Sequence, residues 1–367
     1  MKVVIRVDSS VYIGSGHLVR CLTLARRLEK RGAKVSFIMR DLPGHLGHMV
    51  KKQGFGYEML PPPQERREKI QKITTHSHWL GVHWERDARE TAEVVAQHRS
   101  LDWLVVDHYA IDARWENILR QCVGRIMVLD DLADRLHECD LLLDQNYLTD
   151  MHTRYRNLVP EGCRMFLGPR YALLREEFYR VREKLRNRTG EIERVFVFFG
   201  GYDVGGATKL ALRSLARLNR LDIEVDVVAG TANPHIGEIE NLCRLHPNFM
   251  LHHQTRHMAE LMNRSDLGLG AGGATMWERC FLGLPTLVMV LAENQHKTTL
   301  SSAQYGAVDN LGEFPLVEEK FLTEKLRYFF ENPAKVRLMG IRAMELSEEG
   351  LGPPKQDFVE SLWISGG

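Results

Sequence analysis

The sequence lacks the features that mark several large classes of protein. No stretch approaches the ~18 consecutive apolar residues of a membrane-spanning helix, so no integral membrane segment is expected. Met1 leads straight into an apolar run with no leader peptide, which favours a cytoplasmic location. The formal net charge is only +1, so the composition gives no reason to expect a nucleic-acid partner. Short-period repeats and low-complexity tracts are absent as well.

Cysteine and histidine are present without the spacing of a metal site. The 6 cysteines are scattered and form no C-x-x-C pair, as is typical of free thiols. Histidines gather near residues 76–83 and 252–257, but none has the i, i+4 pairing beside an acid that indicates zinc. We therefore expect no metal and no cofactor.

What the chain does contain is a repeated α/β pattern. Its 367 residues suggest two domains, and apolar runs alternate with helical patterns on both sides of a polar, turn-forming stretch at 182–190. Runs that are apolar on both faces predict parallel sheets covered by helices, in two units that face each other across a cleft. The predicted strands are 2–8, 35–39, 103–107, 125–130, 140–144, 194–199, 223–230, 267–270 and 285–290.

The most informative motif is Gly14-Ser15-Gly16-His17, between the first strand and a helical pattern. A glycine turn at a helix start exposes backbone N–H groups that bind anions, so Gly14, Ser15 and Gly16 are candidate substrate-binding residues. The same helix end disfavours a charged imidazole, which predicts that His17 accepts a proton. A nicotinamide-binding turn would need a third glycine where Val19 stands. The alternative for His17 is a capping or packing role.

A second glycine turn follows a later strand. Gly272, Gly273, Ala274 and Thr275 open a helix and are candidate phosphate ligands. Glu278 follows one turn later, within reach of a ribose held beside the phosphates. The alternative for Glu278 is an acid that favours the helix dipole.

Three further groups have weaker signals. Asn294 and Gln295 carry the donors and acceptors that suit sugar hydroxyl or acetamido groups, but loop amides also commonly face solvent. Asp107 ends a strand and is a candidate for lining a sugar pocket or for capping the next helix. Gly200 and Gly201 suit either a phosphate contact or a tight turn.

Taken together, these residues resemble the nucleotide-sugar hydrolases of pseudaminic acid biosynthesis, a family that includes related spore-coat polysaccharide proteins. The resemblance covers most of the chain in order. Its motifs are Ile5–Asp8, Gly14–His17 with Arg20–Ala25, Trp79–Val82, Asp102–Tyr109, Val128–Asp131, Asp144–Asn146, Phe199–Gly201, Trp277–Cys280 and Ala292–Gln295.

The resemblance implies a GT-B fold, with two Rossmann-like domains at 1–175 and 190–345 and a helical tail at 346–367. It implies hydrolysis of a UDP-linked diacetamido-trideoxy sugar, with His17 as general base on water. It also implies that Glu278 holds the ribose, that the turn from Gly272 to Thr275 holds the diphosphate, and that the backbone near Met258 meets the uracil.

Two alternatives stay open at this point. A UDP-sugar-dependent glycosyltransferase would keep the same fold and the same base, and a non-catalytic scaffold would keep only UDP binding. The chain also departs from the family where Tyr202-Asp203-Val204-Gly205-Gly206 replaces the usual Ala-Asp-Pro after Gly201. This departure leaves the identity of the sugar open, and the sequence does not indicate an oligomeric state.

Overall fold

The computed structural model describes residues 1–63, 76–98, 100–231, 233–253, 255–348 and 358–363. The chain divides into two compact units. Unit 1 holds residues 1–146 and 150–173 together with the last helix, and unit 2 holds residues 147–149 and the chain from 174 to the end of the preceding helix. The chain therefore leaves unit 1 near residue 173 and returns to it near the C-terminus. Residues 349–357 and 364–367 of the expected tail lie outside the described part.

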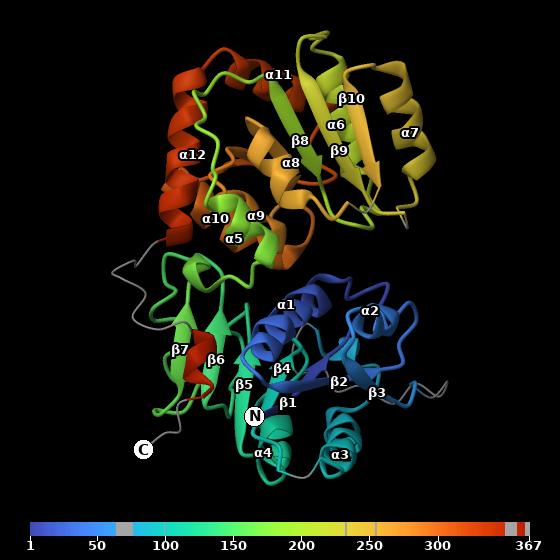
Figure 1. The fold of residues 1–367 in the computed structure, drawn as a ribbon, viewed down its shortest axis with the longest axis vertical. Coiled ribbons are helices and arrows are strands. Elements are labelled where there is room, and N and C mark those ends of the chain that lie inside the picture. The colour runs from blue at the N-terminus through green and yellow to red at the C-terminus, as the bar shows by residue number, and fades with distance from the viewer. Residues whose placement is uncertain (64–75, 99, 232, 254, 349–357, 364–367) are drawn as a thin grey trace. The chain divides into compact units, whose positions relative to one another are not determined.

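Unit 1 is built on a seven-stranded parallel sheet in the order β3-β2-β1-β4-β5-β6-β7 (Figure 1). Helices cover both faces, as the runs of residues buried on both sides predicted. Its strands are β1 (Lys2–Val7), β2 (Lys34–Arg40), β3 (Gly56–Leu60), β4 (Trp103–Asp107), β5 (Arg125–Leu129), β6 (Leu141–Asp144) and β7 (Arg164–Leu167). Its helices are α1 (Gly16–Lys30), α2 (Gly47–Lys52), η1 (Ser77–Leu80), α3 (Trp84–Val95), α4 (Ala113–Arg120), η2 (Pro169–Tyr171) and α13 (Phe358–Ser361).

Unit 2 repeats the plan with a six-stranded parallel sheet in the order β10-β9-β8-β11-β12-β13. Its strands are β8 (Arg194–Phe198), β9 (Glu224–Ala229), β10 (Phe249–His253), β11 (Leu267–Ala271), β12 (Thr286–Val290) and β13 (Asp309–Glu313). Its helices are α5 (Glu176–Arg182), α6 (Ala207–Ala216), α7 (Ile236–Leu245), α8 (Met258–Arg264), α9 (Ala274–Phe281), η3 (Glu293–Gln295), α10 (His296–Tyr305), α11 (Glu319–Phe330) and α12 (Pro333–Glu348).

Both sheets reverse their strand order at one point. In unit 1 the reversal lies between β1 and β4, where Val7 pairs with Asp107. In unit 2 it lies between β8 and β11. Ligands of open parallel sheets bind at the carboxyl ends of the strands at such a switch point. The turns that follow β1, β8 and β11 are the glycine motifs singled out in the sequence.

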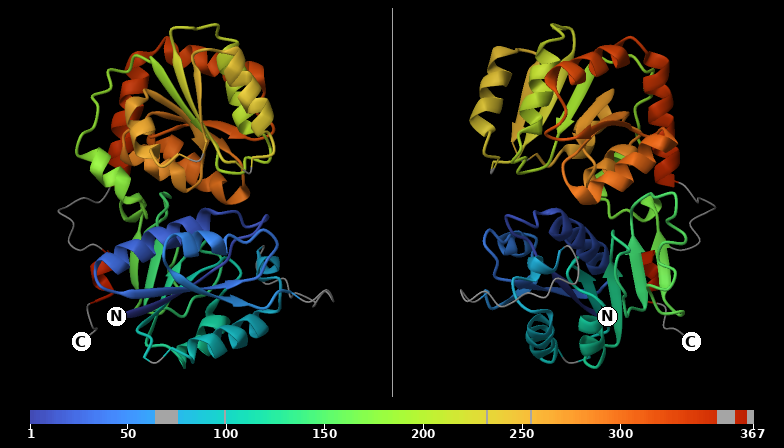
Figure 2. Two further views of the ribbon diagram at one scale, coloured as in Figure 1. Left: turned by 45° about the vertical axis from the view of Figure 1, so that its right-hand side comes forward. Right: turned by 180° about the vertical axis from the view of Figure 1, so that it is seen from behind.

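The core of unit 1 has two layers. Alternate strand residues such as Ile5 and Val105 pack with α1, α2 and α13, and the residues between them, such as Val4 and Leu104, pack with α3 and α4. The C-terminal helix is part of the first layer, because Phe358 and Val359 are buried there and Trp103 Nε1 donates to the Leu362 carbonyl at 2.9 Å. Figure 2 shows this helix against the sheet of unit 1.

Buried charges fix the carboxyl ends of β1 and β2. Arg6 forms ion pairs with Asp8 at 2.6 Å and with Asp87 of α3 at 2.7 Å, and Arg40 pairs with the same Asp87 at 2.7 Å. All four side chains are fully buried. Burial alone would raise the pKa of Asp87, but Arg6 and Arg40 lower it, so the carboxylate stays charged. This network holds the strand end that leads to the His17 turn.

Candidate active site

His17 lies in the first turn of α1, directly after the turn that follows β1. Gly14 has a φ of +77° and donates its N–H to the Ser10 carbonyl at 2.9 Å, which closes the turn. A Cβ on Gly16 would meet no atom within 4 Å, so the space beside this backbone is open. The helix has no side-chain cap at its N-terminus. Gly14, Ser15 and Gly16 therefore have the geometry expected of a turn that a ligand can approach.

The His17 ring is held by a carboxylate at the end of β4. Its Nδ1 lies 2.5 Å from Asp107 Oδ1, and the imidazole is 8% exposed. Because an ionised carboxylate only accepts hydrogen bonds, the proton belongs on Nδ1. Nε2 is then the nitrogen free to take a proton. This is the arrangement of a general base oriented by an acid.

Asp107 is buried among several hydrogen-bond donors. It is 1% exposed, and it accepts from Arg20 Nε at 2.6 Å, from Arg20 Nη2 at 2.7 Å and from Cys21 Sγ at 3.3 Å as well as from His17. Burial alone would raise its pKa, but Arg20 and His17 hold it well below the usual range. These contacts place the Asp107 carboxylate against His17 and Arg20 at the end of β4.

Aromatic rings surround the imidazole. The Tyr109 ring stands edge-on to His17 with centroids 4.5 Å apart, and the Trp79 ring does the same at 5.8 Å. Trp79 and Tyr109 stack on each other at 5.4 Å, and His76 packs against both. These rings restrict the imidazole to one orientation.

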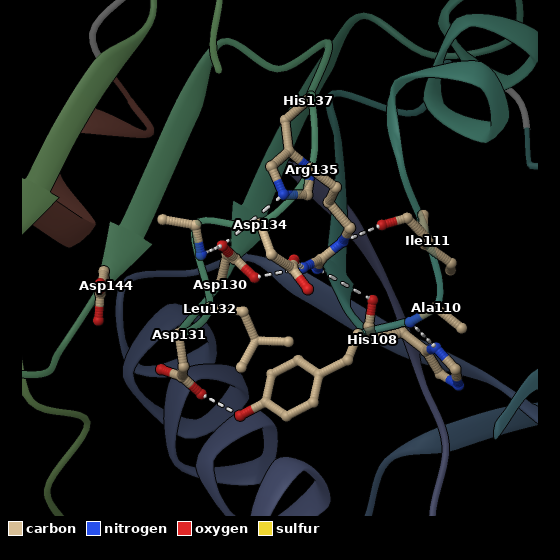
Figure 3. Close-up of polar contacts among 12 residues, drawn as sticks. His108, Ala110, Ile111, Asp130, Asp131, Leu132, Asp134, Arg135, His137 and Asp144 are labelled. Atoms are coloured by element: carbon tan, nitrogen blue, oxygen red, sulfur yellow. Dashed lines mark hydrogen bonds and ion pairs between the residues drawn. The ribbon is translucent and has the colours of Figure 1, made fainter. Parts of the chain in front are cut away.

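Neighbouring strand ends carry three more aspartates (Figure 3). Asp130 pairs with Arg135 at 2.8 Å and caps the backbone N–H of Ala133, so its role is structural. Asp131 accepts from the Tyr109 hydroxyl at 2.6 Å and from Asn146 Nδ2 at 2.9 Å. Burial and the charge of Asp131 raise the pKa of Asp144 to about 7, against the opposing effect of Arg154.

In unit 2 the turn from Gly272 to Thr275 opens α9. The helix has Gly273 as N-cap, no side-chain cap and no acid in its first turn, so its N–H groups have no competing side chain. A Cβ on Gly272 would lie 2.2 Å from Thr299 Oγ1, so only glycine fits there. A Cβ on Gly273 would meet only Gln295 Nε2, at 3.6 Å. The structure thus places Gln295 beside this turn.

The neighbouring η3 turn carries both predicted amides. Gln295 accepts the Leu291 N–H through Oε1 at 3.0 Å, which leaves Nε2 on the side of Gly273. Asn294 is exposed.

Glu278 is held through one oxygen. Arg175 donates to its Oε1 from Nε at 3.1 Å and from Nη2 at 3.0 Å. Its Oε2 is buried and has no hydrogen-bond partner in the described part of the chain. Burial raises the pKa of Glu278, and Arg175 offsets this in part. A buried acceptor without a partner is costly, so it points to a missing donor.

Two residues that the sequence did not indicate connect Glu278 to the start of α8. Arg175 also pairs with Glu177 at 2.7 Å. Glu177 Oε2 lies 3.5 Å from the backbone N of Ala259, next to Met258. Arg175 and Glu177 lie at the end of the predicted first domain, before the polar stretch at 182–190, where no motif in the sequence marks a ligand-binding residue.

The Gly200–Gly201 turn follows β8 and differs from the turn at α9. Gly200 has a φ of +106°, and a Cβ on either glycine would meet no atom within 4 Å. The next helix, α6, is capped by Asp203, which accepts from the N–H groups of Ala207 at 2.9 Å and Thr208 at 2.8 Å. The N–H groups that a phosphate would need there are already bonded. The unusual loop sequence therefore supplies a side-chain acceptor at the start of α6, whereas the start of α9 has none among the described residues.

The structure brings the predicted residues together as two sets. Unit 1 holds Gly14, Ser15, Gly16, His17 and Asp107 at the β1–β4 switch point. Unit 2 holds Gly200, Gly201, Gly272, Gly273, Ala274, Thr275 and Gln295 at the β8–β11 switch point, with Glu278 one turn along α9. Sequence reasoning missed the part played by Arg20, although its place three residues after His17 puts both on one face of α1.

The described residues hold neither a metal-binding cluster nor a membrane-spanning helix. No group of three or more His, Cys, Asp or Glu side chains there is arranged to hold a metal ion. Within the same residues, every helix is too short or too polar to cross a membrane.

Comparison with known proteins gives no matching family model. The chain is similar to the UDP-2,4-diacetamido-2,4,6-trideoxy-beta-L-altropyranose hydrolase of Campylobacter jejuni, with 27% identity over 83% of this chain and 97% of the relative. It is also 28% identical to the spore coat polysaccharide biosynthesis protein SpsG of Bacillus subtilis, over 50% of this chain and 55% of that protein.

Solved structures show the same fold at low sequence identity. The MurG protein of Acinetobacter baumannii superposes with a TM-score of 0.63 and 13% identity, covering 99% of both chains. The UGT89C1 protein of Arabidopsis thaliana, complexed with UDP-L-rhamnose, gives a TM-score of 0.66 and 15% identity over 99% of both chains. With its two parallel sheets, the chain therefore has the GT-B fold.

Proposed function

We propose that this protein hydrolyses a UDP-linked diacetamido-trideoxy sugar at its anomeric carbon and releases UDP and the free sugar. The similarity to a hydrolase of that substrate class supports the reaction, and it extends over most of both chains. The observation that carries the proposal is the 2.5 Å contact between His17 Nδ1 and Asp107, which leaves Nε2 as a proton acceptor beside an open glycine turn.

The chemistry needs one base. Water attacks the anomeric carbon while His17 Nε2 removes its proton, and the bond from that carbon to the diphosphate oxygen breaks. The bonding electron pair leaves with UDP. Glycosidases need a second carboxylic acid because an alkoxide leaves poorly, whereas a nucleoside diphosphate is already a good leaving group. General base catalysis of this kind contributes roughly 10²–10⁴-fold.

Unit 2 supplies the nucleotide-binding residues in this proposal. The N–H groups from Gly272 to Thr275 receive the diphosphate at the uncapped start of α9. The unpartnered Oε2 of Glu278 accepts a ribose hydroxyl, and the backbone near Met258 meets the uracil. Gln295 and Asn294 face the sugar. Gly200 and Gly201 stay in the proposal as an open turn beside the sugar or phosphate, with no helix N-terminus behind them.

The test is incubation with UDP-2,4-diacetamido-2,4,6-trideoxy-β-L-altropyranose in water enriched in oxygen-18. We expect UDP release, with the heavy oxygen in the sugar and none in UDP, because the bond to carbon breaks. His17→Ala should lower kcat by at least about 100-fold while calorimetry still detects UDP binding. His98→Ala is the matched control, since His98 makes only a partly exposed pair with Glu58 at 3.4 Å.

Other outcomes separate the alternatives. Turnover that appears only when a hydroxyl acceptor is added identifies a glycosyltransferase. UDP binding without any turnover identifies a scaffold. Unchanged turnover in His17→Ala removes this histidine from the mechanism.

A further inference from the structure

Arg20 occupies a position between two carboxylates that the proposed reaction does not explain. Its Nε and Nη2 form a fork onto Asp107, at 2.6 and 2.7 Å, and its Nη1 donates to Asp131 Oδ2 at 2.5 Å. Its Nη2 also lies 3.2 Å from His17 Nδ1. The side chain is only 8% exposed, so these charges interact with little screening by water.

The guanidinium is permanently charged here. Burial alone would lower the pKa of Arg20, but Asp107 and Asp131 hold it well above the ordinary value. The group around His17 therefore contains two carboxylates and one cation. Without that cation, no positive charge in this group would balance the two carboxylates.

The other titratable groups that pack here come from several elements. Cys21 lies on α1, Tyr109 follows β4, and His76 precedes η1. Asp144 of β6 shares the neighbourhood of Asp131, and burial together with Asp131 raises its pKa to about 7. Of the residues named around His17, Arg20 is the one that carries a permanent positive charge and donates hydrogen bonds to Asp107.

We propose that Arg20 is a positioning residue, whose fork onto Asp107 fixes this carboxylate so that it orients His17 through Nδ1, and whose charge balances the carboxylates beside the imidazole. This inference rests on the proposed function for its kinetic readout. It assigns Asp131 a part as well, because Asp131 holds the third nitrogen of Arg20 and the hydroxyl of Tyr109, whose ring packs on His17.

The inference predicts shifts of opposite sign in two variants. Arg20→Gln removes the cation, so the acidic limb of the kcat/KM profile should move to higher pH by about one pH unit or more. Asp131→Asn removes a negative charge, so the same limb should move to lower pH. Protein labelled with ¹⁵N-histidine supplies a second readout, because NMR follows the titration of His17 itself without turnover.

The outcomes are distinct. A merely structural role lowers kcat equally at every pH and leaves the titration midpoint of His17 in place, which would overturn the inference. Shifts of the same sign in both variants would overturn it too. If Arg20→Gln does not fold, Asp131→Asn alone tests the sign. Titration shifts as predicted in a protein that hydrolyses no UDP-sugar would support the part of Arg20 and reject the proposed function.

Discussion

Two adjacent glycines at the start of α9 separate a structural from a ligand-binding role. In Gly272→Ala the new methyl group would lie 2.2 Å from Thr299 Oγ1 and 3.3 Å from Gln295 Cβ. Overpacking of this kind costs about 1–3 kcal/mol. For a domain of this size, each kcal/mol lowers Tm by about 2–4 °C, so a loss of about 2 to about 12 °C is expected.

Gly273→Ala is expected to fold normally. The nearest atom to its methyl group would be Gln295 Nε2 at 3.6 Å, an ordinary contact, and its backbone at φ −84°, ψ −162° suits alanine. Alanine is a poorer N-cap than glycine, which lowers the free energy of unfolding. Alanine also reduces the conformational entropy of the unfolded chain, which raises the free energy of unfolding by about 0.4–1 kcal/mol, so the two effects offset each other. Tm should change by less than about 3 °C.

UDP affinity should fall more in Gly273→Ala, whose Tm changes little, than in Gly272→Ala, whose Tm falls. In the proposed site, the methyl group of Gly273→Ala stands where the diphosphate approaches the backbone. Losing one charge-assisted hydrogen bond is worth about 1.5–3 kcal/mol, which weakens UDP binding about 10- to 150-fold. Isothermal calorimetry and thermal unfolding measure the two effects, with Gly237→Ala of α7 as control because its methyl group would meet no atom within 4 Å. Wild-type UDP affinity in Gly273→Ala would refute this placement of the diphosphate.

Three further predictions concern other parts of the molecule. Glu278→Gln replaces an unpartnered acceptor and should weaken UDP binding about tenfold while leaving pyrophosphate binding unchanged, as competition calorimetry can measure. Because the pKa of Asp144 is raised to about 7, its contribution to stability is present below the unfolded value of about 4 and is lost as pH rises through about 7. The Tm of the wild type should therefore fall more between about pH 5 and about pH 8 than that of Asp144→Asn, and equal slopes would contradict this. Since Cys139 Sγ and Cys163 Sγ lie 3.6 Å apart, diamide should oxidise both thiols to one disulfide, with loss of two hydrogens, and Cys163→Ser should abolish the linked peptide in a mass map.

The sequence predicted the interior of both sheets and missed their edges. All the predicted strands are interior strands, while β3, β7, β10 and β13 were not predicted, and these are the outermost strands of the two sheets. Prediction relied on continuous apolar runs, which arise where a strand is covered on both faces. Edge strands are only half covered. In β13, for example, a single residue of Asp309–Glu313 is buried.

The candidate site was predictable where a local motif carries it. Gly14–His17 and Gly272–Thr275 are contiguous in the chain, and their turns fall at the switch points of the two sheets. The contacts of Asp107 and Arg20 were not predictable, because they join positions 87 residues apart. The residues next to Asp107 in the sequence give no sign of the buried cation that pairs with it.

The loop after Gly201 shows a different limit. Its departure from the family pattern was visible, but its consequence depends on Asp203 capping α6, which requires the backbone of this loop to fold back on the helix. Asp203 has a φ of +38°, a conformation that aspartate adopts more readily than most residues. Sequence alone gave no reason to assign it to the cap.

The return of the chain to its first unit limits how the protein can be dissected. A fragment that stops near residue 173 lacks Phe358 and Val359, and it loses the carbonyl that accepts from Trp103. Such a fragment would expose apolar surface beside α1, the helix that carries His17. Attempts to express the amino-terminal half by itself should therefore yield aggregation-prone material, and supplying the last residues as a peptide or a fusion should restore its solubility.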